Sequence, residues 1–204
     1  MAYVVPDGNA INFNLSGLYS TPGGNLIGFN LGEESEQGFV DIPLNIGTNV
    51  LDIYYDSCYV LVCTTSGVEC LDSRTLSSVW YFNSTIVKSV CSDQSVVCFG
   101  TTSSGIYYND FPGDTNDLGD FLSSCTSVED LTSSCINDIC TTVGSGFFAG
   151  GENGIDILVS SDLNELSVSC QLTCSGVNSV ACSENTGTYY WSTENAVYSS
   201  DTCE

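Results

Sequence analysis

The stretch LDIYYDSCYVLVCTTSGVECLDS, residues 51–73, contains the pattern that decides the fold. A run of β-branched and aromatic residues is followed by a polar break, a second such run, and a Ser-Gly turn that leads into a third run. These residue types favour strands, and glycine favours the turns between them. The stretch therefore predicts three short antiparallel strands joined by tight turns.

The same pattern occurs three more times along the chain. The later copies are SVCSDQSVVCFGTTSSGIYYND at 89–110, DICTTVGSGFFAGGENGIDILVSSD at 138–162 and SVACSENTGTYYWSTENAVYSSD at 179–201. The turn positions before each third strand, spaced 38, 49 and 42 residues apart, are Gly67, Gly105, Gly154 and Ala196. Repeats of about 40 residues with three or four strands each are typical of propeller blades.

We therefore expect an all-β fold in which residues 37–204 form a small, about four-bladed β-propeller. The last repeat is one strand short, and we predict that the strand-like segment 39–44 pairs beside residues 188–199 and completes it. A β-sandwich is the alternative fold, because its strands have similar spacing. No stretch shows sustained 3.6-residue periodicity, so long helices are not expected.

Residues 1–36 are expected to form a separate tandem element and linker. The opening sequence repeats with a period of 16 residues, each unit combining a Pro-x-Gly-Asn turn with an Ile-x-Phe-x-Leu strand. Two such units make a hairpin-like pair that is marginal by itself and needs another surface. The residues expected to dock on that surface are Tyr3, Pro6, Ile11, Phe13, Tyr19, Pro22, Ile27 and Phe29.

The two units, YVVPDGNAINFNLSG at 3–17 and YSTPGGNLIGFNLG at 19–32, resemble tandem elements of structural and tail-associated proteins of tailed bacteriophages. The resemblance covers residues 1 to about 32 and implies attachment within the virus particle. It implies a protein on the particle exterior, as capsid decoration, neck or collar component, or tail accessory. Its partners would be other virion proteins, and it would form a homo-oligomer or multi-copy assembly. The alternative is a receptor-binding or glycan-binding adhesin module of a tail fibre.

The charge of the chain narrows the possible functions. There are 25 acidic residues against Arg74 and Lys88 alone, with no histidine, and the formal net charge is -23. Such a chain repels phosphate, so neither nucleic acid nor an anionic membrane is an expected partner. Without histidine, Ser-His-Asp and Cys-His catalytic arrangements and mixed Cys/His zinc sites cannot form. We therefore expect a protein that is not an enzyme and needs no cofactor.

One acidic stretch, NDFPGDTNDLGD at 109–120, partly matches a calcium-binding loop. The candidate ligands are Asp114, Asn116 and Asp120. Asp114 and Asn116 suit the first and third positions of such a loop, but its fifth and twelfth positions would be Leu118 and Cys125, which are not ligands for calcium. A solvated insertion between blades is the alternative interpretation.

Twelve cysteines in 204 residues favour disulfides, which need oxidising surroundings. No export signal precedes them, so we expect a virion protein made in the host cytoplasm and released by lysis into an oxidising exterior. The candidates are Cys63 and Cys70 beside one turn, Cys125 and Cys135 around the long insertion, Cys170 and Cys174 beside a short loop, and Cys203 as a link between chains. Reduced thiols in the core are the alternative.

Adjacent aromatic residues suggest a contact surface. Neighbouring side chains on a strand point to opposite faces, so in each of the pairs Tyr54-Tyr55, Tyr107-Tyr108 and Tyr189-Tyr190, the last followed by Trp191, we expect one tyrosine to be exposed and the other to be packed. Exposed aromatic side chains are common at interaction surfaces.

Overall fold

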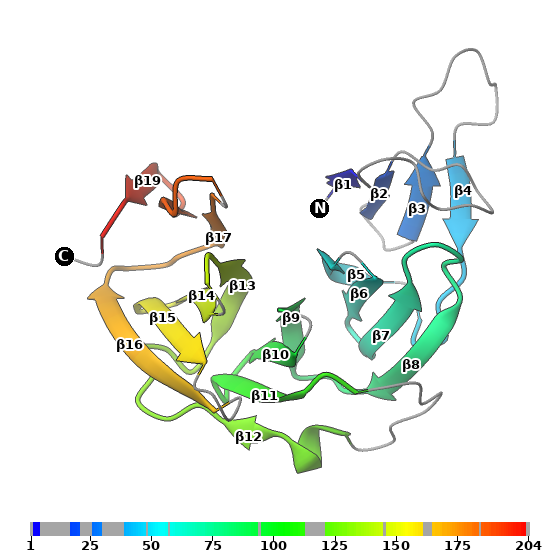
Figure 1. The fold of residues 1–204 in the computed structure, drawn as a ribbon, viewed down its shortest axis with the longest axis horizontal. Coiled ribbons are helices and arrows are strands. Elements are labelled where there is room, and N and C mark those ends of the chain that lie inside the picture. Colours follow the sequence, from blue (N-terminus) through cyan, green and yellow to red (C-terminus); the bar gives the residue numbers. More distant parts are fainter. Residues whose placement is uncertain are drawn as a thin grey trace. The chain divides into compact units, whose positions relative to one another are not determined.

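The structure, a computed structural model, confirms the all-β fold (Figure 1). Within the residues that it describes, the regular elements are short antiparallel strands, joined by turns, and a short 3-10 helix at Phe121–Ser124. The residues that it describes are 2–4, 17–20, 26–29, 39–47, 49–56, 58–93, 95–112, 121–144, 146–160, 165–183 and 185–202.

The first four strands form one antiparallel sheet, which we call the N-terminal sheet. The strands are β1 (Ala2–Val4), β2 (Gly17–Ser20), β3 (Leu26–Phe29) and β4 (Phe39–Ile42), and they pair in that order. Chain neighbours pair because a short connection loses little entropy when it closes. The predicted strand of the second unit, residues 27–31, overlaps β3, whereas that of the first unit, residues 11–15, lies outside the described residues.

The predicted partner of segment 39–44 is wrong. Strand β4 pairs with β3, with Leu26 opposite Ile42, and not with residues 188–199. Strand β4 pairs with β3 because the two strands are close in the sequence and both contribute to one core. Leu26 and Ile42 are buried together with Val60, Val62 and Leu71. The expected boundary at residue 36 thus falls inside this sheet.

The rest of the chain forms four antiparallel meanders, which we call blades 1 to 4. Blade 1 consists of β5 (Val50–Asp56), β6 (Tyr59–Thr64), β7 (Gly67–Asp72) and β8 (Ser78–Asn83). Blade 2 consists of β9 (Val87–Ser92), β10 (Val96–Thr101), β11 (Ile106–Asp110) and β12 (Thr126–Ser127). Blade 3 consists of β13 (Ile136–Thr142), β14 (Gly146–Gly151), β15 (Gly154–Ser160) and β16 (Leu166–Thr173).

Blade 4 consists of β17 (Ser179–Cys182), β18 (Tyr189–Ser192) and β19 (Val197–Ser200). Within the described part of the chain it has three strands, as the sequence predicted. The four turn positions also behave as expected, since each one begins or directly precedes the third strand of its blade. Each repeat of the sequence therefore corresponds to one blade.

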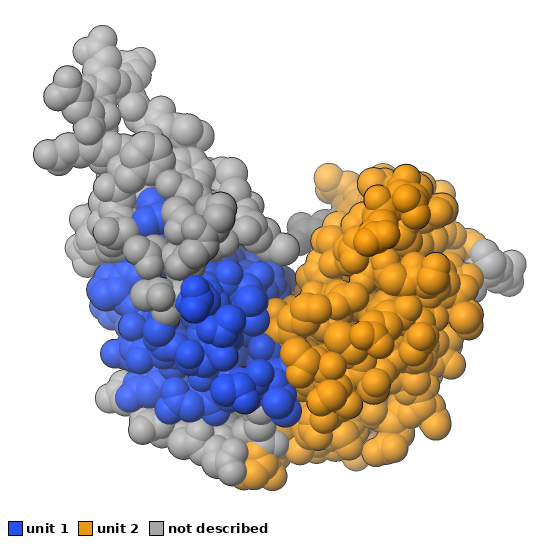
Figure 2. Space-filling model, turned by 180° about the vertical axis from the view of Figure 1, so that it is seen from behind, with its two compact units in different colours: residues 1–87, 112–121 blue, residues 88–111, 122–204 orange. Residues whose placement is uncertain are grey.

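The chain divides into two compact units, coloured in Figure 2. Unit 1 comprises residues 1–87 and 112–121, which include the N-terminal sheet and blade 1. Unit 2 comprises residues 88–111 and 122–204, which include nearly all of blades 2, 3 and 4. Inner strands such as β6, β10 and β14 are buried along almost their whole length.

Buried carboxylates hold the blades to the segments that precede them. In blade 1, Glu69 accepts hydrogen bonds from the backbone N–H and the side-chain amide of Asn45, both at 2.7 Å. At the equivalent position of blade 3, two residues after the turn glycine, Asp156 accepts from the Thr132 hydroxyl at 2.8 Å and from Gln171 at 2.8 Å. These bonds satisfy acids that would otherwise be costly to bury.

A third carboxylate, that of Asp138, joins blade 3 to blade 4. Its Oδ1 accepts the Ile139 N–H at 3.0 Å, and its Oδ2 accepts the Ser179 hydroxyl at 2.6 Å and the Val180 N–H at 2.9 Å. The register of β13 shifts between Ile136 and Asp138, which leaves local backbone groups for the carboxylate to satisfy. Asp138 therefore links blade 3 to β17, the first strand of blade 4, by hydrogen bonds.

The buried carboxyl group of Asp138 predicts that the stability of the protein depends on pH. Burial raises the pKa of Asp138, and the hydrogen bonds from Ser179, Val180 and Ile139 oppose it only in part. The folded protein therefore holds this proton more tightly than the unfolded chain does. The stability contributed by this group is present at low pH and is lost as pH rises from about 3.9, the ordinary value, through the raised value.

We expect wild-type protein to lose more unfolding free energy between about pH 4, close to the ordinary pKa of an aspartate, and pH 7.5 than the Asp138→Asn variant, whose amide cannot ionise. Urea denaturation at both pH values measures the two losses. Glu129→Gln is the control, because it removes one charge at an exposed position. Equal pH dependence in wild type and Asp138→Asn would contradict the prediction.

Candidate ligand-binding site

The candidate site lies in unit 2, on the face of blade 4 that packs against blade 3. Alternation along β18 places Tyr189 and Trp191 on this face and Tyr190 on the other. Pairing extends the face, because Val180 lies opposite Trp191 on β17 and Tyr198 lies opposite Trp191 on β19. The predicted split is confirmed for this pair, since Tyr190 is 41% exposed and Tyr189 packs against the core of blade 3. It is wrong for the other two pairs, because Tyr54, Tyr55 and Tyr107 are half-buried and Tyr108 is buried.

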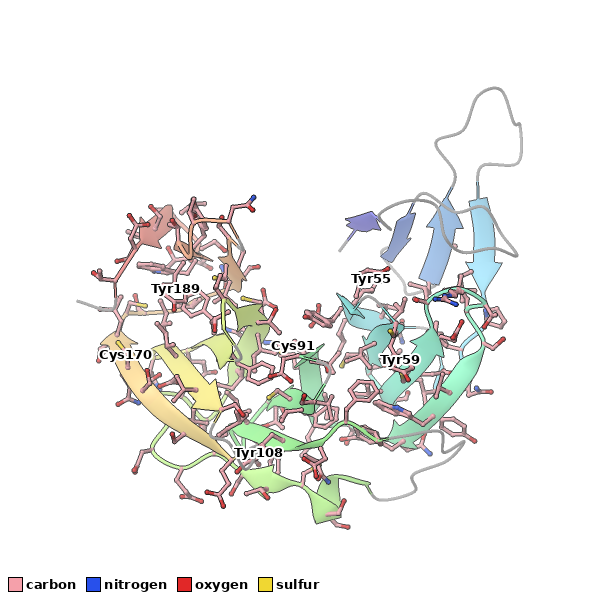
Figure 3. The ribbon with its side chains drawn as sticks, viewed as in Figure 1. Tyr55, Tyr59, Cys91, Tyr108, Cys170 and Tyr189 are labelled. Carbon is pink, nitrogen blue, oxygen red and sulfur yellow. The ribbon has the colours of Figure 1, made fainter. Side chains whose placement is uncertain are left out.

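Ring contacts hold the aromatic side chains of the site in place. The rings of Phe148 and Tyr189 are tilted by 51°, with centroids 5.0 Å apart. The rings of Trp191 and Tyr198 are stacked at 17°, with centroids 5.6 Å apart. Figure 3 shows Tyr189 among the side chains of this part of the protein. Both geometries are favourable arrangements for aromatic pairs, so the site is built before a ligand arrives.

Two cavities flank Trp191. The first has a volume of about 250 Å³ and is lined by Phe148, Ile155, Ile157, Leu172, Tyr189, Trp191, Ser199, Ser200 and Thr202. The second has a volume of about 550 Å³ and is lined by Cys174, Ser175, Gly176, Asn178, Trp191, Thr193, Glu194, Asn195 and Tyr198. The lining of the first is mostly apolar and includes three serine or threonine residues, and the lining of the second is about equally polar and apolar. We call them the apolar pocket and the polar pocket.

The electrostatics of the site exclude some ligands. Neither Arg74 nor Lys88 lines either pocket, and Lys88 donates a hydrogen bond to Asn137 on blade 3. Glu194 adds a carboxylate to the polar pocket. Burial raises the pKa of Tyr189, and the nearby Cys182 and Cys140 thiols raise it further, so the Tyr189 hydroxyl stays protonated. The site therefore suits neutral or positively charged ligands.

An aromatic wall with hydroxyl groups beside it can hold a small ring-shaped ligand. The apolar C–H face of a sugar ring stacks on an aromatic side chain, while its hydroxyls bond to serine, threonine and amide groups. A small volume and a mostly apolar lining with few polar groups are typical of small-molecule pockets. The arrangement therefore supplies binding and orientation for a single ring in the apolar pocket.

Other predicted sites fall partly outside the described residues. The calcium candidates Asp114, Asn116 and Asp120 lie outside them, and so do the docking residues Pro6, Ile11, Phe13 and Pro22. Within the described ranges there is no group of three or more metal-binding side chains. Of the other docking residues, Tyr3, Tyr19, Ile27 and Phe29 lie on strands of the N-terminal sheet. Ile27 is 9% exposed, so its side chain is already covered.

The cysteines behave differently from the predicted pairs. Cys170 is disulfide-bonded, whereas Cys63, Cys70, Cys125, Cys135 and Cys174 are thiols. The predicted pair of Cys170 with Cys174 is wrong, because both lie along one extended segment and are about 13 Å apart at about 3.3 Å per residue. Cys203 lies outside the described residues.

The Cys63 and Cys70 thiols flank the turn between β6 and β7 as expected, but they are not opposite each other. Cys63 lies opposite Val68, and Cys70 lies opposite Leu61. Diagonal positions on neighbouring strands are about 7–8 Å apart, which is at or beyond the limit for a disulfide. Burial raises the pKa of the Cys63 thiol well above its ordinary range, and the charge of Asp52 raises it further.

Sequence reasoning missed two parts of the site. Phe148 lies on a different blade from Trp191, and Tyr198 stacks on Trp191 only because β19 pairs with β18 in one register. The alternation of Tyr189 and Trp191 along one strand was the signal available. Within the described ranges, no helix combines the length and the apolar character that a membrane span needs.

Comparisons with known proteins agree with the fold. No family model matches the sequence, and no curated protein matches it. A solved structure of the Dos1 propeller is similar, with a TM-score of 0.62 and 17% sequence identity over 90% of this chain and 49% of that chain. This chain therefore spans about half the length of that one. Together with the repeated antiparallel meanders, the similarity shows that the chain has a propeller-type all-β fold.

Proposed function

We propose that this chain is a non-enzymatic component of a bacteriophage particle that binds a saccharide at the aromatic pockets of unit 2. The observation that carries the binding role is the position of Trp191, which lines both pockets and stacks on Tyr198. The phage setting rests on the resemblance of the N-terminal tandem motifs. The absence of a basic residue in both linings favours neutral or amine-bearing sugars over acidic ones.

The rigid support of the site favours recognition. Asp138 ties blade 4 to blade 3, and the apolar core of Phe148, Ile155, Ile157, Val177 and Val180 lies directly beneath the aromatic side chains. A preformed pocket loses little entropy when a ligand binds. Such a scaffold is suited to holding a receptor saccharide on the outside of a particle.

A glycan array tests the proposal with the full chain. We expect signals from neutral or amine-bearing glycans and none from sulfated or sialylated ones. For the best glycan, Trp191→Ala is expected to weaken binding about tenfold or more in calorimetric titration, since a central aromatic residue often contributes over 1 kcal/mol.

The matched control is Tyr190→Ala, which removes an exposed aromatic side chain from the opposite face of the same strand. It should bind like the wild type, and circular dichroism should show both variants folded. An array without specific signals, or equal affinities for Trp191→Ala and wild type, would overturn the proposed site.

A purely structural role is the second candidate. The tandem motifs and the strong acidity support a decoration protein that docks on basic partners and contributes no receptor binding. Co-sedimentation with purified particles and a regular array of copies in electron micrographs would favour it if the glycan array stays empty. A chain that never associates with particles contradicts both candidates.

A further inference from the structure

Blade 2 places two cysteines opposite each other on neighbouring strands. The Asp93 N–H donates to the Val96 carbonyl at 3.2 Å, which closes the hairpin between β9 and β10. Two residues further along each strand, this antiparallel register brings Cys91 opposite Cys98. After two more residues it brings Ser89 opposite Gly100, and a Cβ built on Gly100 would lie 2.6 Å from the Ser89 hydroxyl, as that register requires.

The other blades do not have two small residues in this layer. Two residues back from the pair that closes each hairpin, the equivalent pairs are Tyr54 with Leu61, Cys140 with Phe148, and Ala181 with Tyr190. Each contains at least one large side chain. In blade 2 both residues of this pair are cysteines. The two thiols therefore contact each other at a position where the other blades have at least one aromatic or leucine side chain.

The geometry of this pair suits a disulfide. Cys91 and Cys98 are both 0% exposed, and their side chains are hydrogen-bonded. Residues directly opposite in antiparallel strands have Cα atoms about 4.5–5.5 Å apart. A disulfide needs about 4.4–6.8 Å between Cα atoms, so the bond can form without a change of backbone register. Cys91 is labelled in Figure 3.

We propose that Cys91 and Cys98 are a modification site, at which a small-molecule disulfide such as oxidised glutathione forms a cross-strand disulfide within blade 2. One cysteine thiolate attacks the oxidant, forms a mixed disulfide and releases one small thiol. The second thiolate then attacks the protein sulfur and releases the other small thiol. The two cysteines lose two electrons and two protons, and the oxidant gains them as two thiols.

The rate of this reaction is limited by how often the oxidant can reach the buried sulfur atoms. Because both sulfur atoms are buried, the first attack requires the hairpin at 93–96 to open, and Ser95 at its tip is exposed. Burial raises the pKa of the Cys98 thiol more than its hydrogen bond with Cys91 lowers it, so little thiolate is present at neutral pH. Oxidation of the folded protein is therefore slow, and it accelerates at higher pH.

Peptide mapping of the full chain tests the proposal. The folded protein is incubated with oxidised glutathione, unfolded without reductant in an alkylating reagent, and digested. The peptide containing residues 91–98 should be lighter by two hydrogen atoms and free of alkyl groups. Cleavage after Asp93 should yield two pieces that separate only after reduction. Cys140→Ser should leave this bond intact, because Cys140 lies opposite Phe148, whereas Cys91→Ser should abolish it.

The competing partner is Cys125. Burial raises the pKa of Cys125 to about 11; a hydrogen bond with Asn109 lowers it, and the charge of nearby Cys98 raises it. A Cys98 to Cys125 disulfide in wild-type protein would overturn the proposal. So would complete alkylation of Cys91 and Cys98 after prolonged incubation with oxidised glutathione at raised pH, where the reaction is fastest. Both readouts use wild-type protein, so neither depends on the folding of a variant.

Discussion

Replacing Phe148 with alanine should lower the free energy of unfolding by about 3–5 kcal/mol, the range for truncating a large buried aromatic residue. Phe148 is 1% exposed and belongs to the core that joins blade 3 to blade 4. Its removal leaves a cavity and also removes the ring contact with Tyr189. Because both blades supply this core, the rest of the structure cannot collapse into the space at low cost.

Urea denaturation followed by far-UV circular dichroism and by tryptophan fluorescence measures this loss. Trp191 reports on unit 2 and Trp80 on unit 1, so the Phe148→Ala variant should shift the Trp191 signal most. Phe148→Leu is the matched control and should lose about 1.5 kcal/mol or less, since it keeps most of the buried apolar volume. If the alanine variant unfolded like the wild type, the packing described for unit 2 would be incorrect.

The alanine variant should also change the candidate site. Phe148 lines the apolar pocket and contacts Tyr189, so its truncation enlarges the pocket and removes support from the aromatic wall. Saccharide binding should therefore weaken with the stability of unit 2. In Phe148→Leu, binding should be closer to that of the wild type.

Gly67→Ala should have the second large effect, a loss of about 2–3 kcal/mol, because the new methyl group has no space. A Cβ at this position would lie 2.1 Å from the Phe82 carbonyl oxygen, and backbone cannot give way as a flexible side chain does. The backbone conformation adds to the cost, because residues with a side chain rarely adopt the φ angle of Gly67, +156°. The clash lies where β7 begins and pairs with the end of β8.

Gly47→Ala separates the clash from the backbone conformation. Gly47 has a φ of +96°, but its nearest neighbour to a new Cβ is the Ser66 hydroxyl at 3.5 Å. This variant should lose only about 1–2 kcal/mol, the cost of left-handed backbone for a residue with a Cβ. Thermal and urea unfolding of both variants measure the difference. Equal losses would show that the turn at Gly67 tolerates a side chain.

The repeated local pattern explains why much of the fold was predictable. Strand runs followed by a turn at Gly67, Gly105, Gly154 and Ala196 are local features, and each corresponds to the start of a third strand in the structure. The alternation at Tyr189 and Tyr190 also follows from the strand itself, since neighbouring residues point to opposite faces. These predictions needed no knowledge of distant parts of the chain.

Pairing between elements was predicted less well. Segment 39–44 reads as a strand in either position, and only the shared core of Leu26 and Ile42 decides that it joins β3. The disulfide candidates were chosen by spacing along the chain. Spacing alone does not fix the register of a hairpin, and the register decides which residues lie opposite each other. Cys63 and Cys70 are close in sequence and flank one turn, but the register places them at diagonal positions.

The sequence by itself determined the all-β class, the four repeats, the strong negative charge and the opposite faces taken by Tyr189 and Tyr190. Those properties depend on composition and on the two-residue period of a strand. Only the tertiary structure decided which residues meet across strands and blades. Phe148 and Trp191 line one pocket, Asp138 accepts hydrogen bonds from blade 4, and Cys91 lies opposite Cys98. Such contacts depend on strand register and on packing between blades, where a shift of one residue changes every partner.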